Sequence, residues 1–245
     1  MVALSLAASW SCSRAGGAAS PTDANAASDA ASDAAHEGGG SACDRAHLFC
    51  DDFDRGTLGA SWDQTNTSGG PLATDDAHYV SAPRALRAQS AASATPRSVV
   101  LYKNLPGPPG KLHCVFDVLV QKRLGGSADL FELRLDTDDA GASHYYVYLQ
   151  VTETGTFVGQ EILTPDGGSP QLVPVADLPN GQWRHVSFET DFTSFTFSYQ
   201  GEPAHTETMR ALGGTKPQMA IGLVFTEGGG PYDFLFDDVA CDMTP

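Results

Sequence analysis

Basic residues are scarce in this chain. It has 14 Lys and Arg against 30 Asp and Glu, which gives a formal net charge of -16 at pH 7. Nucleic-acid binding needs clustered cations that release the counterions of the phosphates, so this charge excludes a nucleic acid as the partner. The same imbalance disfavours electrostatic docking on anionic lipid. The acid excess persists after residue 43, where it favours solubility and is compatible with calcium.

Aromatic residues are almost missing from the first 45 positions, where Trp10 is the only one. Hydrophobic residues nevertheless make up 41% of the whole chain, so the part that forms a core lies further along. No segment approaches the run of about 18 apolar residues that a helix needs to cross a bilayer. Any membrane attachment is therefore expected to be through a lipid.

A basic residue is also missing ahead of the first apolar run, MVALSLAASWSC. This segment, residues 1–12, nevertheless resembles the end of a bacterial lipoprotein signal, because the small residues Ser9 and Ser11 precede a cysteine. We expect Cys12 to carry the lipid; a cleaved secretion signal and an accidental apolar stretch are the alternatives. Residues 13–42 are rich in Ala, Ser, Gly and Asp and offer little to bury. They are predicted to form a disordered linker to one domain at 43–245.

Cys-x-x-Cys pairs are absent, which argues against a metal cluster. Five cysteines are present, and four remain for two disulfides if Cys12 carries lipid. Disulfides are typical of an oxidising compartment, so we expect an exported chain, either a cell-envelope lipoprotein or a secreted protein. The preferred pairs are Cys43–Cys50, which closes a short loop, and Cys114–Cys241, which joins a middle strand to the last one. Cys50–Cys241 is the alternative, because first and last strands often neighbour one another.

No helical stripe and no internal repeat is found after residue 47. Short segments instead alternate between apolar and polar residues and are separated by Gly, Pro, Asn and Asp, which is typical of β-strands. In 128–136, for example, Phe131, Leu133 and Leu135 share one face. Strands are expected at 111–122, 128–136, 144–151, 156–163, 182–190, 193–199, 219–225 and 233–242. The pattern predicts an all-β fold, a two-sheet antiparallel jelly-roll sandwich.

Short motifs follow one another along this region in a fixed order. They are Phe49-Cys-Asp-Asp-Phe-Asp54 with Leu58-Gly-x-x-Trp62, Ser81-Ala-Pro-Arg-Ala-Leu86, Asn180-Gly-Gln-Trp183 with Val186, and Phe236-Asp-Asp-Val239. Their order and spacing resemble those of concanavalin A-like lectin/glucanase (LamG-like) domains, and the match spans nearly all of 47–243. The resemblance implies a jelly roll whose concave sheet often binds glycans. It implies no particular activity.

The catalytic string of the glucanase branch, Glu-x-Asp-x-(x)-Glu on one strand, is absent. Its nearest counterpart is Glu132-Leu-Arg-Leu-Asp136, in which Arg134 takes the middle position. The Arg-x-Glu-Leu-Arg string of alginate-lyase relatives survives only as Glu132-Leu-Arg134. A Gly-x-Ser-x-Gly elbow is missing too, so serine-hydrolase chemistry is unsupported. We expect a protein without catalysis; if it is an enzyme, Glu132 and Asp136 are the carboxylates to test.

The polar face of the expected hairpin 128–151 is the candidate ligand-binding site. Antiparallel pairing would set Asp136 beside His144, Arg134 beside Tyr146, and Glu132 beside Tyr148. Ligand sites combine aromatic surface with a few polar groups in this way. The candidate ligand-binding residues are Glu132, Arg134, His144, Tyr146, Tyr148 and Gln150. The alternative is an ordinary solvent-facing sheet surface, on which Tyr is favoured by its β-propensity.

Two acidic pairs, Asp51-Asp52 and Asp237-Asp238, fall on the expected first and last strands, which are neighbours in concanavalin A-like domains. Asp52 and Asp238 are candidate ligands of a structural calcium ion, which prefers oxygen ligands. No other cofactor is expected. The run at 136–139 is a second candidate but lacks EF-hand spacing, and the alternative is that all these acids cap turns and protect edge strands. Trp62 and Trp183 are expected to anchor the core or its rim.

Three functions are compatible with these features. We carry forward an exported, surface-tethered, non-catalytic carbohydrate-binding module that recognises polysaccharide on its concave sheet. One alternative is a divergent glycoside hydrolase or polysaccharide lyase of the same fold. The other is a structural or adhesive envelope protein that binds another protein. The expected partner is a polysaccharide or glycan, with membrane contact only through a lipid anchor.

Overall fold

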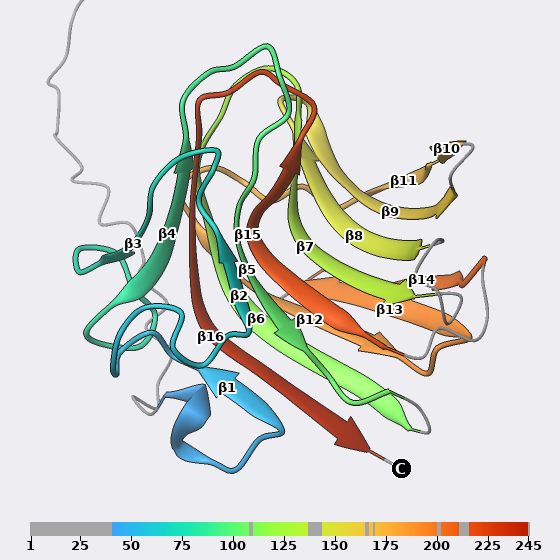
Figure 1. Ribbon diagram of the computed structural model, residues 1–245, viewed down its shortest axis with the longest axis horizontal. Coiled ribbons are helices and arrows are strands. Elements are labelled where there is room, and N and C mark those ends of the chain that lie inside the picture. Colours follow the sequence, from blue (N-terminus) through green and yellow to red (C-terminus); the bar gives the residue numbers. More distant parts are fainter. Residues whose placement is uncertain are drawn as a thin grey trace, which may run out of the picture. The chain divides into compact units, whose positions relative to one another are not determined.

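The computed structural model describes residues 41–107, 110–136, 144–164, 167–168, 170–199, 202–210 and 216–244. The expected signal segment with Cys12, the linker as far as residue 40, and the acidic run at 137–139 lie outside the described residues. Two eight-stranded antiparallel sheets make up most of the described chain (Figure 1). A short 3₁₀ helix, η1 (Ala42–Asp44), precedes them. No described helix is long and apolar enough to span a membrane.

Sheet A holds the first and last strands of the domain. In spatial order it contains β14 (His205–Thr208), β13 (Ser194–Tyr199), β12 (Trp183–Thr190), β6 (Lys111–Arg123), β16 (Tyr232–Thr244), β4 (Ala85–Ser90) and β3 (Leu72–Asp75), and β1 (Phe49–Asp51) also pairs with β16. The long β6 and β16 lie at its centre, and β1 meets β16 where Asp51 is opposite Val239. The expected neighbourhood of the first and last strands is therefore confirmed.

Sheet B holds the expected hairpin. In spatial order it contains β10 (Gly167–Gly168), β9 (Gly155–Thr164), β8 (His144–Thr152), β7 (Ser127–Asp136), β15 (Gln218–Thr226), β5 (Val99–Asn104) and β2 (Gln64–Asn66), and β11 (Gln171–Val175) also pairs with β9. Strands β7, β8 and β9 bend along their length, and the side of sheet B turned away from sheet A is the inner side of this curve (Figure 1). We call this side the concave face.

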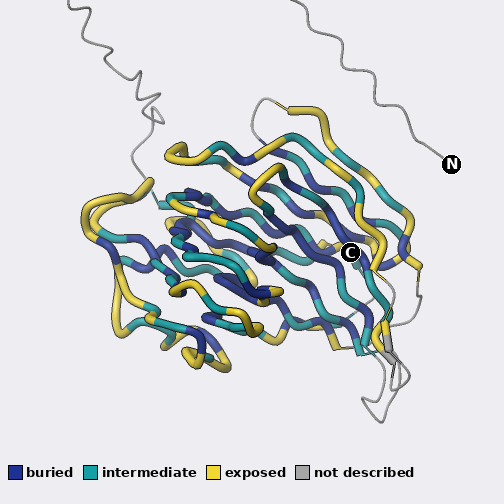
Figure 2. The backbone as a smooth tube through the Cα atoms, turned by 90° about the horizontal axis from the view of Figure 1, so that it is seen from above, coloured by how far each residue is buried: buried dark blue, intermediate teal, exposed yellow. Residues whose placement is uncertain are grey.

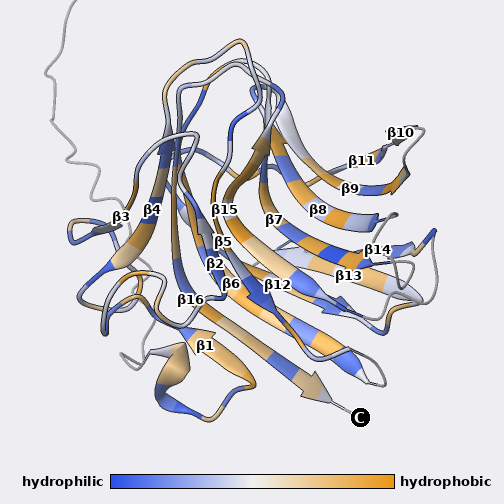
Figure 3. Cartoon of the chain, in the orientation of Figure 1, coloured by the Kyte–Doolittle hydropathy of each residue, from blue (hydrophilic) through white to orange (hydrophobic). Residues whose placement is uncertain are grey.

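Strand formation follows from the alternation of the residues. Hydrophobic and hydrophilic residues alternate along β7 in Figure 3, and Phe131, Leu133 and Leu135 of this strand are buried. Because successive side chains of a strand point to opposite sides, one side enters the core and the other stays available. Figure 2 shows buried positions along the strands and exposed ones mainly in the connecting loops.

The core lies between the two sheets and is rich in phenylalanine. The ring of Phe131 in sheet B lies 5.4 Å from that of Phe116 and 5.0 Å from that of Phe188, both in sheet A. Such aromatic contacts add to the stabilisation that burial of apolar surface provides. The two-sheet sandwich predicted from the sequence is thus confirmed.

Both expected disulfides are present. Cys43 is bonded to Cys50 within the first turn of the domain, and Cys114 is bonded to Cys241 across neighbouring positions of β6 and β16. The alternative pair, Cys50–Cys241, is therefore wrong. Disulfides persist in oxidising environments, so the domain is suited to an extracellular location.

The two tryptophans take different positions. Trp62 is buried, with its ring 4.9 Å from that of Phe49, and its indole N–H donates to Asp51. Trp183 is half-buried and packs on a small apolar cluster of Ala85, Leu119 and Leu235. The expectation that both anchor the core or its rim is confirmed.

Candidate functional site

The residues of the concave face can be read as rows that cross the strands. Directly opposite residues of antiparallel strands project from the same side of the sheet. One row runs from Tyr102 on β5 through Ala220 on β15, Glu132 on β7 and Tyr148 on β8 to Gly159 on β9. This central row places a carboxyl group between a small residue and an aromatic ring.

A second row lies beside the central one. It contains Gln218, Arg134, Tyr146 and Glu161, and the next row pairs Asp136 with His144. The three cross-strand pairs expected from the sequence, Asp136 with His144, Arg134 with Tyr146 and Glu132 with Tyr148, are therefore confirmed.

Arg134, Asp136 and His144 form a hydrogen-bonded group at one end of this face. The Nε and Nη2 atoms of Arg134 donate to Asp136 Oδ1 over 3.2 Å and 3.1 Å, and His144 Nδ1 lies 2.9 Å from the same oxygen. Burial alone would raise the pKa of Asp136, but these contacts hold it below its ordinary value. Asp136 is thus an anion whose charge is already compensated.

Glu132 is in the opposite situation. Its carboxyl group is half-buried and has no hydrogen-bond partner among the described residues. Burial, followed by the nearby charge of Asp129, raises the pKa of Glu132 to about 8, against a smaller lowering by Arg134. Glu132 is therefore largely protonated at neutral pH and can donate a hydrogen bond.

A further row lies on the other side of the central one. It runs from Phe225 on β15 through Asp129, Gln150 and Phe157 to Pro174 on β11. Gln150 Nε2 donates to Asp129 Oδ1 over 2.9 Å, and burial raises the pKa of Asp129 to about 7. The ring of Phe225 is 43% exposed, so this row ends in an accessible aromatic surface.

The two tyrosines expected to contact a ligand differ in accessibility. Tyr146 is half-buried, whereas Tyr148 is only 5% exposed. A Cβ atom added to Gly159 would lie 2.2 Å from the ring of Tyr148, so this ring occupies the space above Gly159 of β9. Gln150 is buried as well. Of the predicted ligand-binding residues, Glu132, Arg134, His144 and Tyr146 are therefore the accessible ones.

The sequence interpretation missed Asp129, Phe157 and Phe225. Val158 is buried and Phe157 precedes it on the same strand, so the two side chains point to opposite sides of the sheet. This alternation alone could have placed Phe157 on the side of the polar residues of the hairpin. Phe225 and Asp129 could not be placed in this way, because the register of β7 and β15 shifts next to both of them.

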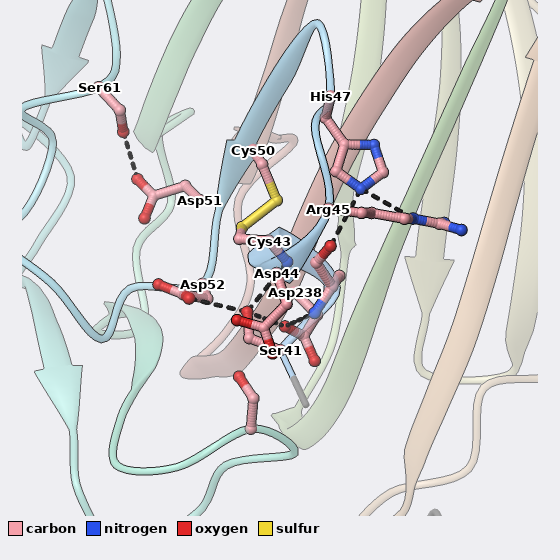
Figure 4. Close-up of a disulfide and its surroundings, with 12 residues drawn as sticks. Ser41, Cys43, Asp44, Arg45, His47, Cys50, Asp51, Asp52, Ser61 and Asp238 are labelled. Atoms are coloured by element: carbon pink, nitrogen blue, oxygen red, sulfur yellow. Dashed lines mark hydrogen bonds between the residues drawn. A yellow bond between two sulfur atoms is a disulfide. The ribbon is translucent and has the colours of Figure 1, made fainter. Parts of the chain in front are cut away.

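The acidic residues near the first and last strands meet at η1 (Figure 4). Ser41 Oγ donates to Asp52 Oδ2 over 2.7 Å and lies 3.4 Å from Asp238 Oδ1, and the Ala42 N–H donates to the same Asp238 oxygen. The expected calcium ligands Asp52 and Asp238 are thus brought together by the chain. Within the described ranges, no three His, Cys, Asp or Glu side chains are grouped to hold a metal ion.

Asp51 and Asp237 have structural roles. They are the sequence neighbours of Asp52 and Asp238. Asp51 accepts hydrogen bonds from Ser61 and Trp62. Asp237 is fully buried and accepts from the N–H groups of Val80 and Ser81. They therefore hold loops in place.

No protein-family model and no curated protein sequence matches the chain. Solved structures do match. A cellulose induced protein, Cip1, gives a TM-score of 0.58 at 14% identity, over 79% of this chain and 96% of that chain. The calreticulin globular domain of T. cruzi gives 0.55 at 12% identity, over 80% and 87%. The conserved carbohydrate esterase of the Shiga toxin-encoding bacteriophage phi24B gives 0.52 at 14% identity, over 82% and 99%.

These likenesses establish the fold of the chain. At such low identities they show a shared β-sandwich of the jelly-roll type, which agrees with the resemblance to concanavalin A-like domains. What the chain binds has to be argued from its own concave face.

Proposed function

We propose that this chain is an exported carbohydrate-binding protein of the concanavalin A-like kind that holds a polysaccharide on its concave face without cleaving it. The observation that carries the proposal is the half-buried ring of Tyr146 beside the hydrogen-bonded group of Arg134, Asp136 and His144. Such a combination of ring surface and fixed polar groups suits a sugar, which has apolar ring faces and hydroxyl edges.

Two further features support the proposal. Phe157 on β9 and Phe225 on β15 extend the aromatic surface beyond Tyr146. The aromatic residues of this face therefore lie on several strands, as contact with a long polymer requires. The named activity of one structurally similar protein, a carbohydrate esterase, belongs to the same ligand class. Export agrees with the two disulfides, and the lipid on Cys12 is part of the same proposal.

The test is retention of the full chain on immobilised polysaccharides, followed by truncation of one ring. Tyr146→Ala is expected to weaken binding at least about tenfold, which corresponds to about 1.4 kcal/mol. Tyr79→Ala is the matched control, because Tyr79 is 42% exposed and lies in the segment between β3 and β4 of the other sheet. Equal retention of both variants by a folded domain would contradict this assignment of the site.

A second candidate function is cleavage of a glycan, and one observation favours it. Glu132 has a raised pKa of about 8, so it holds a proton at neutral pH as a general acid must, and no described residue forms a hydrogen bond with it. Release of reducing ends or unsaturated products from a polysaccharide, with loss of that release in Glu132→Gln, would support it. Binding without any turnover would leave the non-catalytic function as the better description.

A further inference from the structure

Negative charge dominates the concave face. Asp129, Glu132, Asp136 and Glu161 all project from it, as their row positions show. Arg134 is the only Lys or Arg within the rows described above, and its guanidinium donates twice to Asp136. A uronate or sulfate group is recognised best by a free guanidinium or ammonium group, and these rows offer none.

Glu132 lies in the central row of this surface, and no described residue forms a hydrogen bond or ion pair with its carboxyl group. Its neighbours within the central row are Ala220, which is small, and Tyr148, whose ring occupies the space above Gly159. A half-buried carboxylate without a hydrogen-bond donor is costly, and a carboxylic acid in the same place is much less so. The uncharged form also has an O–H group that can donate a hydrogen bond to a sugar hydroxyl or ring oxygen.

We propose that the concave face takes an uncharged polysaccharide, and that Glu132 contacts it as a neutral carboxylic acid that donates a hydrogen bond to a sugar oxygen. This inference rests on the proposed glycan binding and adds the class of glycan. It makes binding dependent on pH, because ionised Glu132 would lose its donor and bring an uncompensated charge to the contact.

The groups around Glu132 agree with this protonation state. On β7, Asp129 raises the pKa of Glu132 and Arg134 lowers it, and Glu161 on β9 raises it. Strand β8 contributes Tyr146, Tyr148 and His144, and β5 contributes Tyr102; β15 contributes the uncharged Ala220 and Gln218. Burial raises the pKa of Tyr146 to about 12, so it remains neutral throughout the relevant range.

Titration of Asp129 could also make glycan binding depend on pH. Burial raises its pKa to about 7, and Glu227 and Glu161 contribute to the rise. Its carboxyl group already accepts a hydrogen bond from Gln150 and is buried, so it does not face a ligand as Glu132 does. An experiment has to separate the two carboxyl groups.

The experiment measures dissociation constants of the full chain for soluble β-glucan and galactomannan, which are uncharged, and for polygalacturonate and alginate, which are anionic. We expect an uncharged polymer to bind and the anionic ones not to bind. Wild-type affinity is expected to fall at least about tenfold between about pH 6 and about pH 9, as a group with a raised pKa loses its proton. At about pH 9, Glu132→Gln is expected to bind at least about tenfold more tightly than the wild type, because the amide remains a donor.

Two variants act as controls. Asp129→Asn should keep the fall in affinity between the two pH values, and Glu132→Ala should bind weakly at both. Preference for an anionic polymer, a flat wild-type pH profile, or a Glu132→Gln variant that is weak at both pH values would each overturn the inference and leave glycan binding intact. A folded protein that binds none of the four polymers at any pH would instead contradict the proposed function itself.

Discussion

Glycine at position 159 determines where the ring of Tyr148 lies. Gly159 lies on β9, next to β8, and has no Cβ atom. The ring of Tyr148 occupies the space that a Cβ atom would fill. Most of a row on a sheet can be inferred from alternation, but the depth of a side chain depends on the residues beside it. This is why the pairing of Glu132 with Tyr148 could be predicted, whereas the burial of Tyr148 could not.

Replacing Gly159 with alanine is therefore expected to disturb the concave face. The new Cβ atom would lie 2.2 Å from a Tyr148 ring carbon, so the ring has to move. The expected loss in the free energy of unfolding is about 1–3 kcal/mol, as in other overpacked positions. Urea denaturation of the variant measures it.

Gly155→Ala on the same strand is the matched control. Its Cβ atom would lie 3.8 Å from Phe157, an ordinary contact distance, so little change is expected. Similar losses for both variants would mean that strand β9 tolerates no alanine, and that the Tyr148 contact is not the cause.

At the scale of elements, the central pairing of β6 with β16 joins a strand from the middle of the chain to the last strand. Cys114 and Cys241 lie opposite each other in this pairing and are fully buried. The sequence predicted the disulfide from the number and placement of the cysteines. The neighbourhood of the first and last strands was expected too, but not that β4 and β1 pair with successive parts of β16, β4 from Tyr232 to Phe236 and β1 from Val239 to Cys241.

The two disulfides are expected to differ in their contribution to stability. They span sequence separations of 7 and 127 residues. In the chain-entropy model, the short loop contributes about 2–3 kcal/mol and the long one about 4–5 kcal/mol. Chemical denaturation of the paired Cys→Ala variants measures both values, with the reduced wild-type protein as the control. A larger loss for the Cys43–Cys50 pair would contradict the expectation.

Calcium binding near β1 and β16 stays a prediction. Burial raises the pKa of Asp54, and the charges of Asp52 and Asp238 add to the rise, which reflects negative charge concentrated beside η1. Backbone carbonyls and water would have to complete the ligand shell. If the ion binds, calcium at a hundredfold excess over its Kd raises stability by about 2.7 kcal/mol. Thermal unfolding with calcium or EDTA checks this, and Asp238→Asn should remove the difference; equal Tm values would exclude the ion.

At the scale of the whole molecule, the buried carboxyl groups of this acidic chain are expected to lower its stability as the pH rises. Burial raises the pKa values of Asp129 and Asp237 to about 7 and that of Glu132 to about 8, against ordinary values of 3.8 and 4.5. At pH values between the ordinary pKa and the raised pKa of such a group, the folded state holds more protons than the unfolded chain does. The free energy of unfolding therefore falls as the pH rises through this range. Groups with a lowered pKa, such as Asp136, act only near and below about pH 4.

The domain is therefore expected to be more stable at about pH 5 than at about pH 8, with a slope of at most about 1.4 kcal/mol per pH unit for each such group. Thermal unfolding across this range should show a steadily falling Tm. Asp129→Asn should flatten the dependence, since it removes one of the titrating groups. A Tm that rises towards pH 8 would contradict the raised pKa values.

The position of η1 also places the first described residues beside sheet A. Ser41 contacts β16 of sheet A through Asp238, whereas the concave face is the outer side of sheet B (Figure 1). A domain immobilised directly at Ser41 would be held on the side of sheet A and would leave the concave face of sheet B free. The same geometry would let an array of such domains on a solid support capture a long polymer at many points at once, with an avidity well above that of one copy.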